Sequence, residues 1–209
     1  MTAAGPSPFF QLSETSLALI NRALAAFRLE VDAASGTGVV VALPSRIWSG
    51  RARLSSTRRR GVRTEDALVR FMSIADEFTF GLLIHVTETK LPKDERIRVL
   101  WARYEERHSD TWEQRFASWE ALHKVAVSSF PKYSPLWGYI EARNAIVHGV
   151  GSLTRRQLAK RARSVGRLST ARIGVSGDRV ILAPGNAIEC AVVVRELITW
   201  LDAQAASIT

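Results

Sequence analysis

The sequence predicts an all-α fold with one small β-hairpin before the C-terminal helix, and three observations support this. Apolar residues recur at helical spacing in several stretches, as Leu17, Ile20 and Leu24 do. Residues that favour helix N-termini precede these stretches, and proline or glycine follows most of them. Few stretches carry the alternating pattern of a strand. The 209 residues suit a single domain spanning residues 1–209.

Capping signals set the expected limits of the helices. Residues 13–16 offer several N-caps for the first helix, and the acidic residues of 64–66 suit the first turn of the second. Ser134, followed by proline, is the expected N-cap of the central helix, and Ser152 and Asn186 are expected to cap the two that follow. The expected helices cover residues 17–34, 64–89, 93–107, 109–125, 135–148, 153–165 and 187–206.

Two regions are expected to be non-helical. Residues 171–175 and 179–182 flank a Ser-Gly-Asp turn, which is typical of a β-hairpin. Residues 39–43 have the composition of a short strand, and the following stretch is basic and lacks apolar periodicity. A mobile basic loop is therefore predicted at about residues 35–63. Its arginines either bind nucleic acid or belong to a solvated linker: Arg51, Arg53, Arg58, Arg59, Arg60 and Arg63.

The charge balance indicates the class of partner. Lys and Arg number 29 against 20 Asp and Glu, which leaves a formal net charge of +9. Such an excess favours nucleic-acid backbones, anionic membrane surfaces or an acidic protein. Cys190, the only cysteine, cannot form an internal disulfide, and the start of the chain lacks a secretory signal, so a cytoplasmic location is expected. No apolar run reaches the roughly 18 residues needed to span a bilayer.

The segment from Arg143 to His148 is the motif with the clearest chemical content. Asn144 and His148 are four residues apart on one helix and share a face. Arg143 lies about 140° round the helix from His148, but its long side chain has the reach to bring the guanidinium forward. The three side chains are therefore expected to converge on one phosphate. The alternative is structural, with Arg143 pairing with a neighbouring helix and His148 satisfying a helix C-terminus.

The motif, in the longer form EARNAIVHGVG, resembles the Arg-x4-6-His motif of the HEPN superfamily, whose members are typically all-α bundles. The polar residue after Arg143 and the glycine after His148 also resemble the family form. The resemblance implies a HEPN-type bundle. It further implies a metal-independent endoribonuclease that acts as a homodimer, with two copies of the motif in one cleft between subunits.

By the same resemblance, Arg143 holds the scissile phosphate, His148 transfers the proton and Asn144 orients one of them. RNA supplies its own nucleophile in the 2′-OH, so the products are a 2′,3′-cyclic phosphate and a 5′-OH. Small HEPN proteins often act as toxins or in phage defence, which implies an antitoxin or a defence-system protein as partner. Some HEPN domains have lost catalysis, so the alternative is an inactive module that binds RNA or a partner protein.

A basic segment follows the motif. No acidic residue occurs between Ala142 and Gly177, and the cations there either contact an RNA backbone or form a solvated helix face. The candidates for nucleic-acid binding are Arg155, Arg156, Lys160, Arg161 and Arg163.

Other chemistry-bearing residues have ordinary expectations. Asp76 or Glu77 is a candidate partner for Arg143, a surface position being the alternative, and the helical spacing of Trp101, Trp112, Trp119 and Trp137 indicates core packing. No metal or other cofactor is expected, because the remaining histidines lie without a carboxylate or cysteine at metal-ligand spacing. These are His85, His108 and His123.

Overall fold

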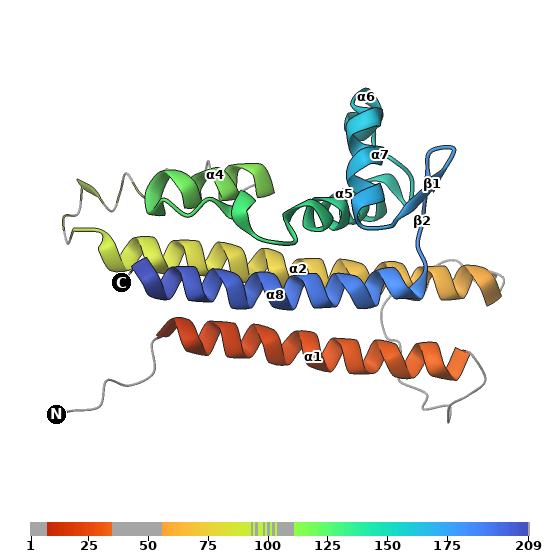
Figure 1. The fold of residues 1–209 in the computed structure, drawn as a ribbon, viewed down its shortest axis with the longest axis horizontal. Helices are drawn as coiled ribbons and strands as arrows, with labels where there is room; N and C mark the ends of the chain where they lie inside the picture. The colour runs from red at the N-terminus through yellow and green to blue at the C-terminus, as the bar shows by residue number, and fades with distance from the viewer. Residues whose placement is uncertain are drawn as a thin grey trace.

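The computed structural model describes residues 8–34, 56–92 and 111–208, together with residues 94, 96, 97, 99, 101 and 103. The described part confirms the all-α fold with a single hairpin (Figure 1). Its elements are α1 (Pro8–Ala34), α2 (Ser56–Lys90), α4 (Trp112–His123), the 3-10 helix η1 (Val127–Ser129), α5 (Tyr133–Gly149), α6 (Arg155–Ala159), α7 (Arg161–Thr170), β1 (Gly174–Ser176), β2 (Arg179–Ile181) and α8 (Pro184–Ile208).

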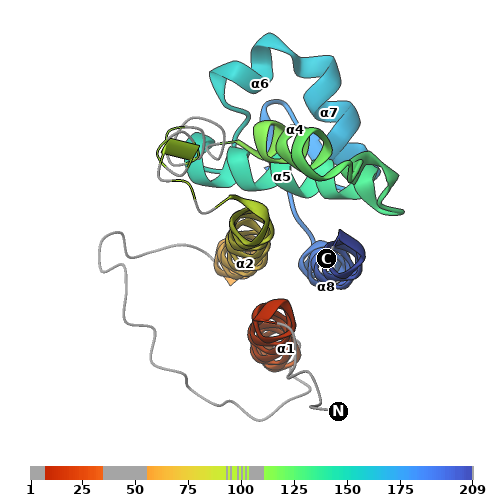
Figure 2. The ribbon, with the colours of Figure 1, turned by 90° about the vertical axis from the view of Figure 1, so that its left-hand side faces the viewer.

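Three long helices form the base of the molecule. α2 and α8 run in the same direction and α1 runs opposite to them (Figure 1). The end-on view shows α1 below the pair, with α5 and α4 on the other side and α6 and α7 beyond α5 (Figure 2). The layer formed by α2 and α8 therefore has helices on both sides. This explains why Leu68 and Phe71 on α2 and Leu197 on α8 are completely buried.

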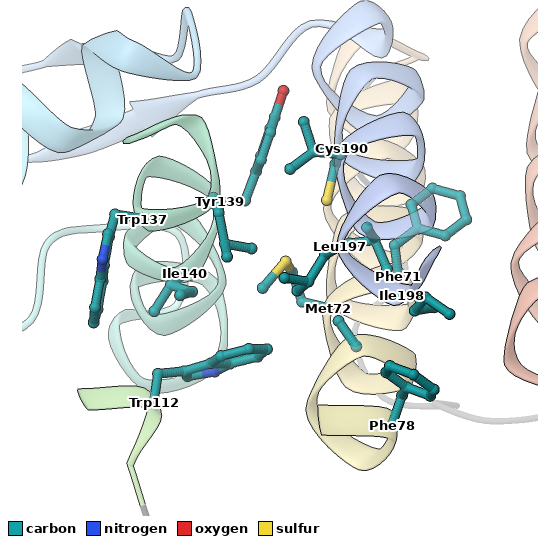
Figure 3. Close-up of a cluster of buried hydrophobic side chains, with 14 of the residues drawn as sticks. Phe71, Met72, Phe78, Trp112, Trp137, Tyr139, Ile140, Cys190, Leu197 and Ile198 are labelled. Atoms are coloured by element: carbon teal, nitrogen blue, oxygen red, sulfur yellow. The ribbon is translucent and has the colours of Figure 1, made fainter. Parts of the chain in front are cut away.

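α5 is covered on both sides over most of its length. Tyr139 faces α2 and α8 beside the buried Cys190, whereas Trp137 points to the opposite side of α5 (Figure 3). Residues 136–142 are all buried, and the last turn emerges into solvent, where Val147 is 44% exposed. A helix buried all round has little hydrophobic periodicity, so its orientation depends on its neighbours.

The first two helices begin earlier than the sequence predicts. α1 begins at Pro8, and the expected cap residues Ser13 and Ser16 are buried within it. Proline fits the first turn of a helix because the missing N–H has no partner there. α2 begins at Ser56, so the predicted loop is wrong for residues 56–63, where the arginines are good helix formers.

The central helix and the basic segment also differ in detail from prediction. Lys132, not Ser134, is the N-cap of α5. The helix expected over residues 153–165 is two helices broken at Lys160, and Thr154 rather than Ser152 caps the first of them. Thr154 and Gln157 form a capping box, in which each side chain bonds the other residue's backbone N–H. The Gln157 side chain also donates a hydrogen bond to the Glu141 carbonyl (2.9 Å), which ties α6 to α5.

The hairpin and the last helix follow the predicted order. β1 and β2 pair antiparallel with Val175 opposite Val180, and Gly177 takes the left-handed conformation that the tight turn requires (φ 59°). α8 begins at Pro184 rather than after Asn186. Asn186 caps it from within the first turn, because its Oδ1 accepts a hydrogen bond from the Ala183 N–H (2.8 Å).

Some predictions fall on residues that are not described. The short strand at 39–43, Arg51, Arg53 and the side chains of the arginines at 58–63 lie outside the described part. Most of the helix expected at 93–107 also lies outside it. Its described residues 96, 97, 99, 101 and 103 are helical.

Candidate active site

Arg143, Asn144 and His148 lie where α5 emerges from the core. Ala142 and Ala145 remain buried, whereas Arg143 and Asn144 are half-buried and His148 is exposed. The helix ends at Gly149, one residue after the histidine, because Val150 has a left-handed backbone (φ 52°) and its N–H bonds the Ala145 carbonyl. The motif thus combines a backbone anchored in the core with polar ends that reach solvent.

The guanidinium of Arg143 bridges the other two motif side chains. Its Nη1 donates a hydrogen bond to Asn144 Oδ1 (3.2 Å) and lies 3.3 Å from His148 Nε2. Because a guanidinium can only donate, a hydrogen bond in this contact requires Nε2 to accept, which is open only to the imidazole tautomer with its proton on Nδ1. In that tautomer the Nε2 lone pair of His148 faces the positively charged guanidinium of Arg143.

A groove of about 460 Å³ lies beside this pair. Its walls are α5, α6 and α7, with the start of α4 and one side chain of α2 closing it. Three cations that line it have no ion pair within the described residues. They are Arg143, Arg156 and Lys160.

The groove separates the predicted nucleic-acid-binding residues into two groups. Arg156, Lys160 and Arg163 line it, as do the three motif residues. Arg155 and Arg161 do not, and Arg161 instead binds the hairpin turn through Asp178 and the Gly177 carbonyl. Arg155 and Arg156 are neighbours on α6 and so point about 100° apart, whereas Arg161 lies beyond the break between α6 and α7 at Lys160.

A network centred on Glu141 is the main feature that sequence reasoning missed. Glu141 is buried on α5, where Oε1 accepts from Arg167 Nη1 (2.9 Å) and Oε2 accepts from Gln157 Nε2 (2.7 Å). Arg167 also stacks over the ring of Trp137 at 4.0 Å. Two signals were present: a carboxylate inside an apolar run, and the Thr-x-x-Gln pattern of the capping box.

Asp76 faces the groove from α2, but its partner is Arg115 and not Arg143. Arg115 on α4 is 4% exposed and donates to Asp76 Oδ1 (2.6 Å) and to the hydroxyl of Thr79 (3.0 Å). This pair fastens α4 to α2, and the rings of Trp112 and Phe80 flank the guanidinium. Glu77 is exposed on the same helix.

No protein-family model, curated protein or solved structure matches this chain.

Within the described part, no three or more histidine, cysteine or acidic side chains gather in a way that would hold a metal ion. Each helix in that part is too short or too polar to serve as a membrane span. Burial raises the pKa of the Cys190 thiol well above its usual range, so this cysteine stays protonated and unreactive.

The electrostatics of the groove favour an anion. The C-terminus of α5 carries a partial negative charge that disfavours phosphate, and the three unpaired cations offset it. A bound phosphodiester would meet the Arg143 guanidinium and the His148 imidazole together. The arrangement is therefore able to bind a phosphodiester and accept a proton from a neighbouring hydroxyl.

Proposed function

We propose that this protein is a metal-independent endoribonuclease of the HEPN type. The observation that carries the proposal is the 3.3 Å contact between Arg143 Nη1 and His148 Nε2 at a groove lined by further cations. It joins an anion-binding group to a general base at one point.

The reaction balances as a transesterification. A phosphate oxygen takes the place of Nε2 as the acceptor for Arg143, which frees the lone pair of the neutral His148 imidazole. Nε2 accepts the 2′-OH proton while the 2′-oxygen bonds to phosphorus, and the bond to the 5′-oxygen breaks. The products are a 2′,3′-cyclic phosphate and a 5′-OH. Arg143 stabilises the charge that develops on the phosphate.

The leaving 5′-oxygen needs a proton from a second acid. His148 is the only imidazole among the described residues that line the groove. We assign the acid to His148 of a second copy, in a homodimer with two motifs in one cleft. Val147 and Val150 flank His148 and are 44% and 89% exposed, so a second copy would cover apolar surface there. The resemblance to HEPN toxins further suggests a toxin or phage-defence role.

An RNase assay on the purified protein in EDTA tests the proposal. Arg143→Ala and His148→Ala should each lower cleavage about 100-fold or more. Arg155→Ala is the matched control, because it removes the same charge near the motif from a side chain that does not line the groove. The cleaved RNA should carry a cyclic phosphate, and a 2′-deoxy substitution at the cleavage site should prevent the reaction.

Three results would contradict the proposal. Undiminished cleavage in both alanine variants would reject the site, and cleavage at a 2′-deoxy nucleotide would reject the chemistry. A wild-type protein that binds RNA without cutting it would be an inactive binding module instead. The mass in solution tests the dimer, since a strict monomer has only one of the two motifs.

A further inference from the structure

Three carboxylates among the described residues line the groove, and they are held very differently. Asp76 pairs with Arg115 at 2.6 Å, and both oxygens of Glu141 accept hydrogen bonds shorter than 3.0 Å. Glu113, in the first turn of α4, has only looser contacts. Its Oε1 lies 3.5 Å from Arg163 Nη2 and 3.7 Å from Arg167 Nη2.

These contacts of Glu113 are weak by their length and by their exposure. Both exceed the usual length of a charged hydrogen bond, and the Glu113 side chain is 50% exposed. Solvated ion pairs of this kind contribute little to stability. The Glu113 carboxylate therefore occupies an anion site between two arginines, and another anion can displace it from there.

Of the two arginines, Arg167 is held in place before any ligand binds, whereas Arg163 is more exposed. Arg167 is 20% exposed and is held by Glu141 on one side and by the Trp137 ring on the other, which leaves Nη2 turned towards Glu113. Arg163 lies four residues earlier, on the same face of α7. A guanidinium that is already ordered loses less entropy when it binds an anion.

We infer that Arg163 and Arg167 form a second phosphate subsite, where the carboxylate of Glu113 stands in for a phosphate until RNA displaces it. This inference rests on the proposed function, since it takes RNA as the ligand. The subsite and the motif line the same groove. Glu141, which holds Arg167, lies only two residues before Arg143 but about 160° round α5 from it, and about 10 Å along the helix from His148. We therefore assign to the subsite a phosphate other than the scissile one.

A binding assay without a cleavage step tests the subsite. The probe is a short fluorescent single-stranded RNA with 2′-O-methyl riboses, which lack the attacking hydroxyl, and the readout is anisotropy. Glu113→Gln should bind about threefold or more tighter than Glu120→Gln, because removing the stand-in anion frees both arginines. Glu120 is the matched control, since it is exposed on α4 and does not line the groove.

Two further variants assign the gain to the subsite. Arg163→Ala should weaken binding and lower the slope of log affinity against log salt by about one. In the Arg163→Ala background, Glu113→Gln should raise RNA affinity less, because the arginine for which Glu113 and the phosphate compete is already absent. Thermal unfolding of each variant checks that α4 and α7 remain folded.

Equal affinities of Glu113→Gln and Glu120→Gln would overturn the inference, as would a wild-type protein that does not bind the probe. The outcome is separate from that of the nuclease assay. A protein without catalysis can still show the effect of Glu113, and a nuclease that depends on Arg143 and His148 can lack it.

Discussion

Gly138 on α5 lies directly against the backbone of Arg167 on α7. A Cβ atom at position 138 would lie 2.5 Å from the Arg167 carbonyl oxygen and 2.6 Å from the Ala171 Cβ. Only glycine allows the two helices to approach this closely. The approach brings the Arg167 guanidinium over Trp137 and within reach of Glu141.

Gly138→Ala should therefore force α7 away from α5. We expect the free energy of unfolding to fall by about 1–3 kcal/mol, as for overpacking in a core, and RNA affinity to fall with it. Gly166→Ala on α7 is the control, because a Cβ there meets nothing within 4 Å. That variant should gain about 0.5–1 kcal/mol from helix propensity. Urea unfolding measures both, and equal stabilities would show that the close approach is not required.

Glu141→Gln tests the network that joins α5, α6 and α7. The substitution preserves shape but leaves Arg167 without its nearest countercharge, and we expect a loss of about 3 kcal/mol. The loss should lie at the lower end for a buried pair, since Arg167 is 20% exposed. Glu120→Gln, on the exposed face of α4, should change stability by less than about 0.5 kcal/mol. A Glu141→Gln protein that unfolds at the wild-type urea concentration would refute the role of the network.

His123 predicts how stability depends on pH. Its Nε2 lies 2.9 Å from the hydroxyl of Thr87, and burial, together with the nearby Lys90, lowers its pKa from 6.5. The unfolded chain then takes up a proton before the folded one does. The free energy of unfolding should therefore decrease as the pH falls below about 6.5, until the folded form is protonated too.

His123→Gln should remove this decrease while keeping a donor near Thr87. Burial raises the pKa values of Glu65, Asp66 and Asp202, which makes an opposite contribution at lower pH. The difference between wild type and variant isolates the histidine for this reason. Urea unfolding above and below pH 6.5 supplies the measurement. Parallel stability curves for the two proteins would be inconsistent with the prediction.

Where local signals were sufficient, sequence prediction and structure agree. The helical periodicity of α1, α2 and α8 and the turn before β2 are each encoded within a few residues, and the structure has these elements in the predicted order. The errors lie at helix ends and at Lys160, where the single helix expected over residues 153–165 is broken. Ser13 lies within α1 because the residues before it continue the helix, although its side chain suits an N-cap equally well.

The candidate site also has some features that the sequence predicts and others that only the folded structure sets. The i and i+4 positions of Asn144 and His148 place them on one face of any helix, and that much is visible in the sequence. The 3.3 Å approach of Arg143 to His148 required a particular path of a flexible side chain. Glu113, Glu141 and Arg167 come from three helices. The apolar run around Glu141 indicates that its carboxylate needs a partner, but the local sequence does not indicate that Arg167 is that partner or that Glu113 lies beside it.

By itself, then, the sequence determined a helical protein with a hairpin, a basic segment and a polar motif at a helix end. The tertiary structure decided which cations border the groove and which carboxylates accompany them. The physical reason is the sequence separation over which each kind of interaction acts. Caps and periodicity act between residues at most four apart, whereas the Arg167–Glu141 pair spans 26 residues and forms only because α7 packs against Gly138.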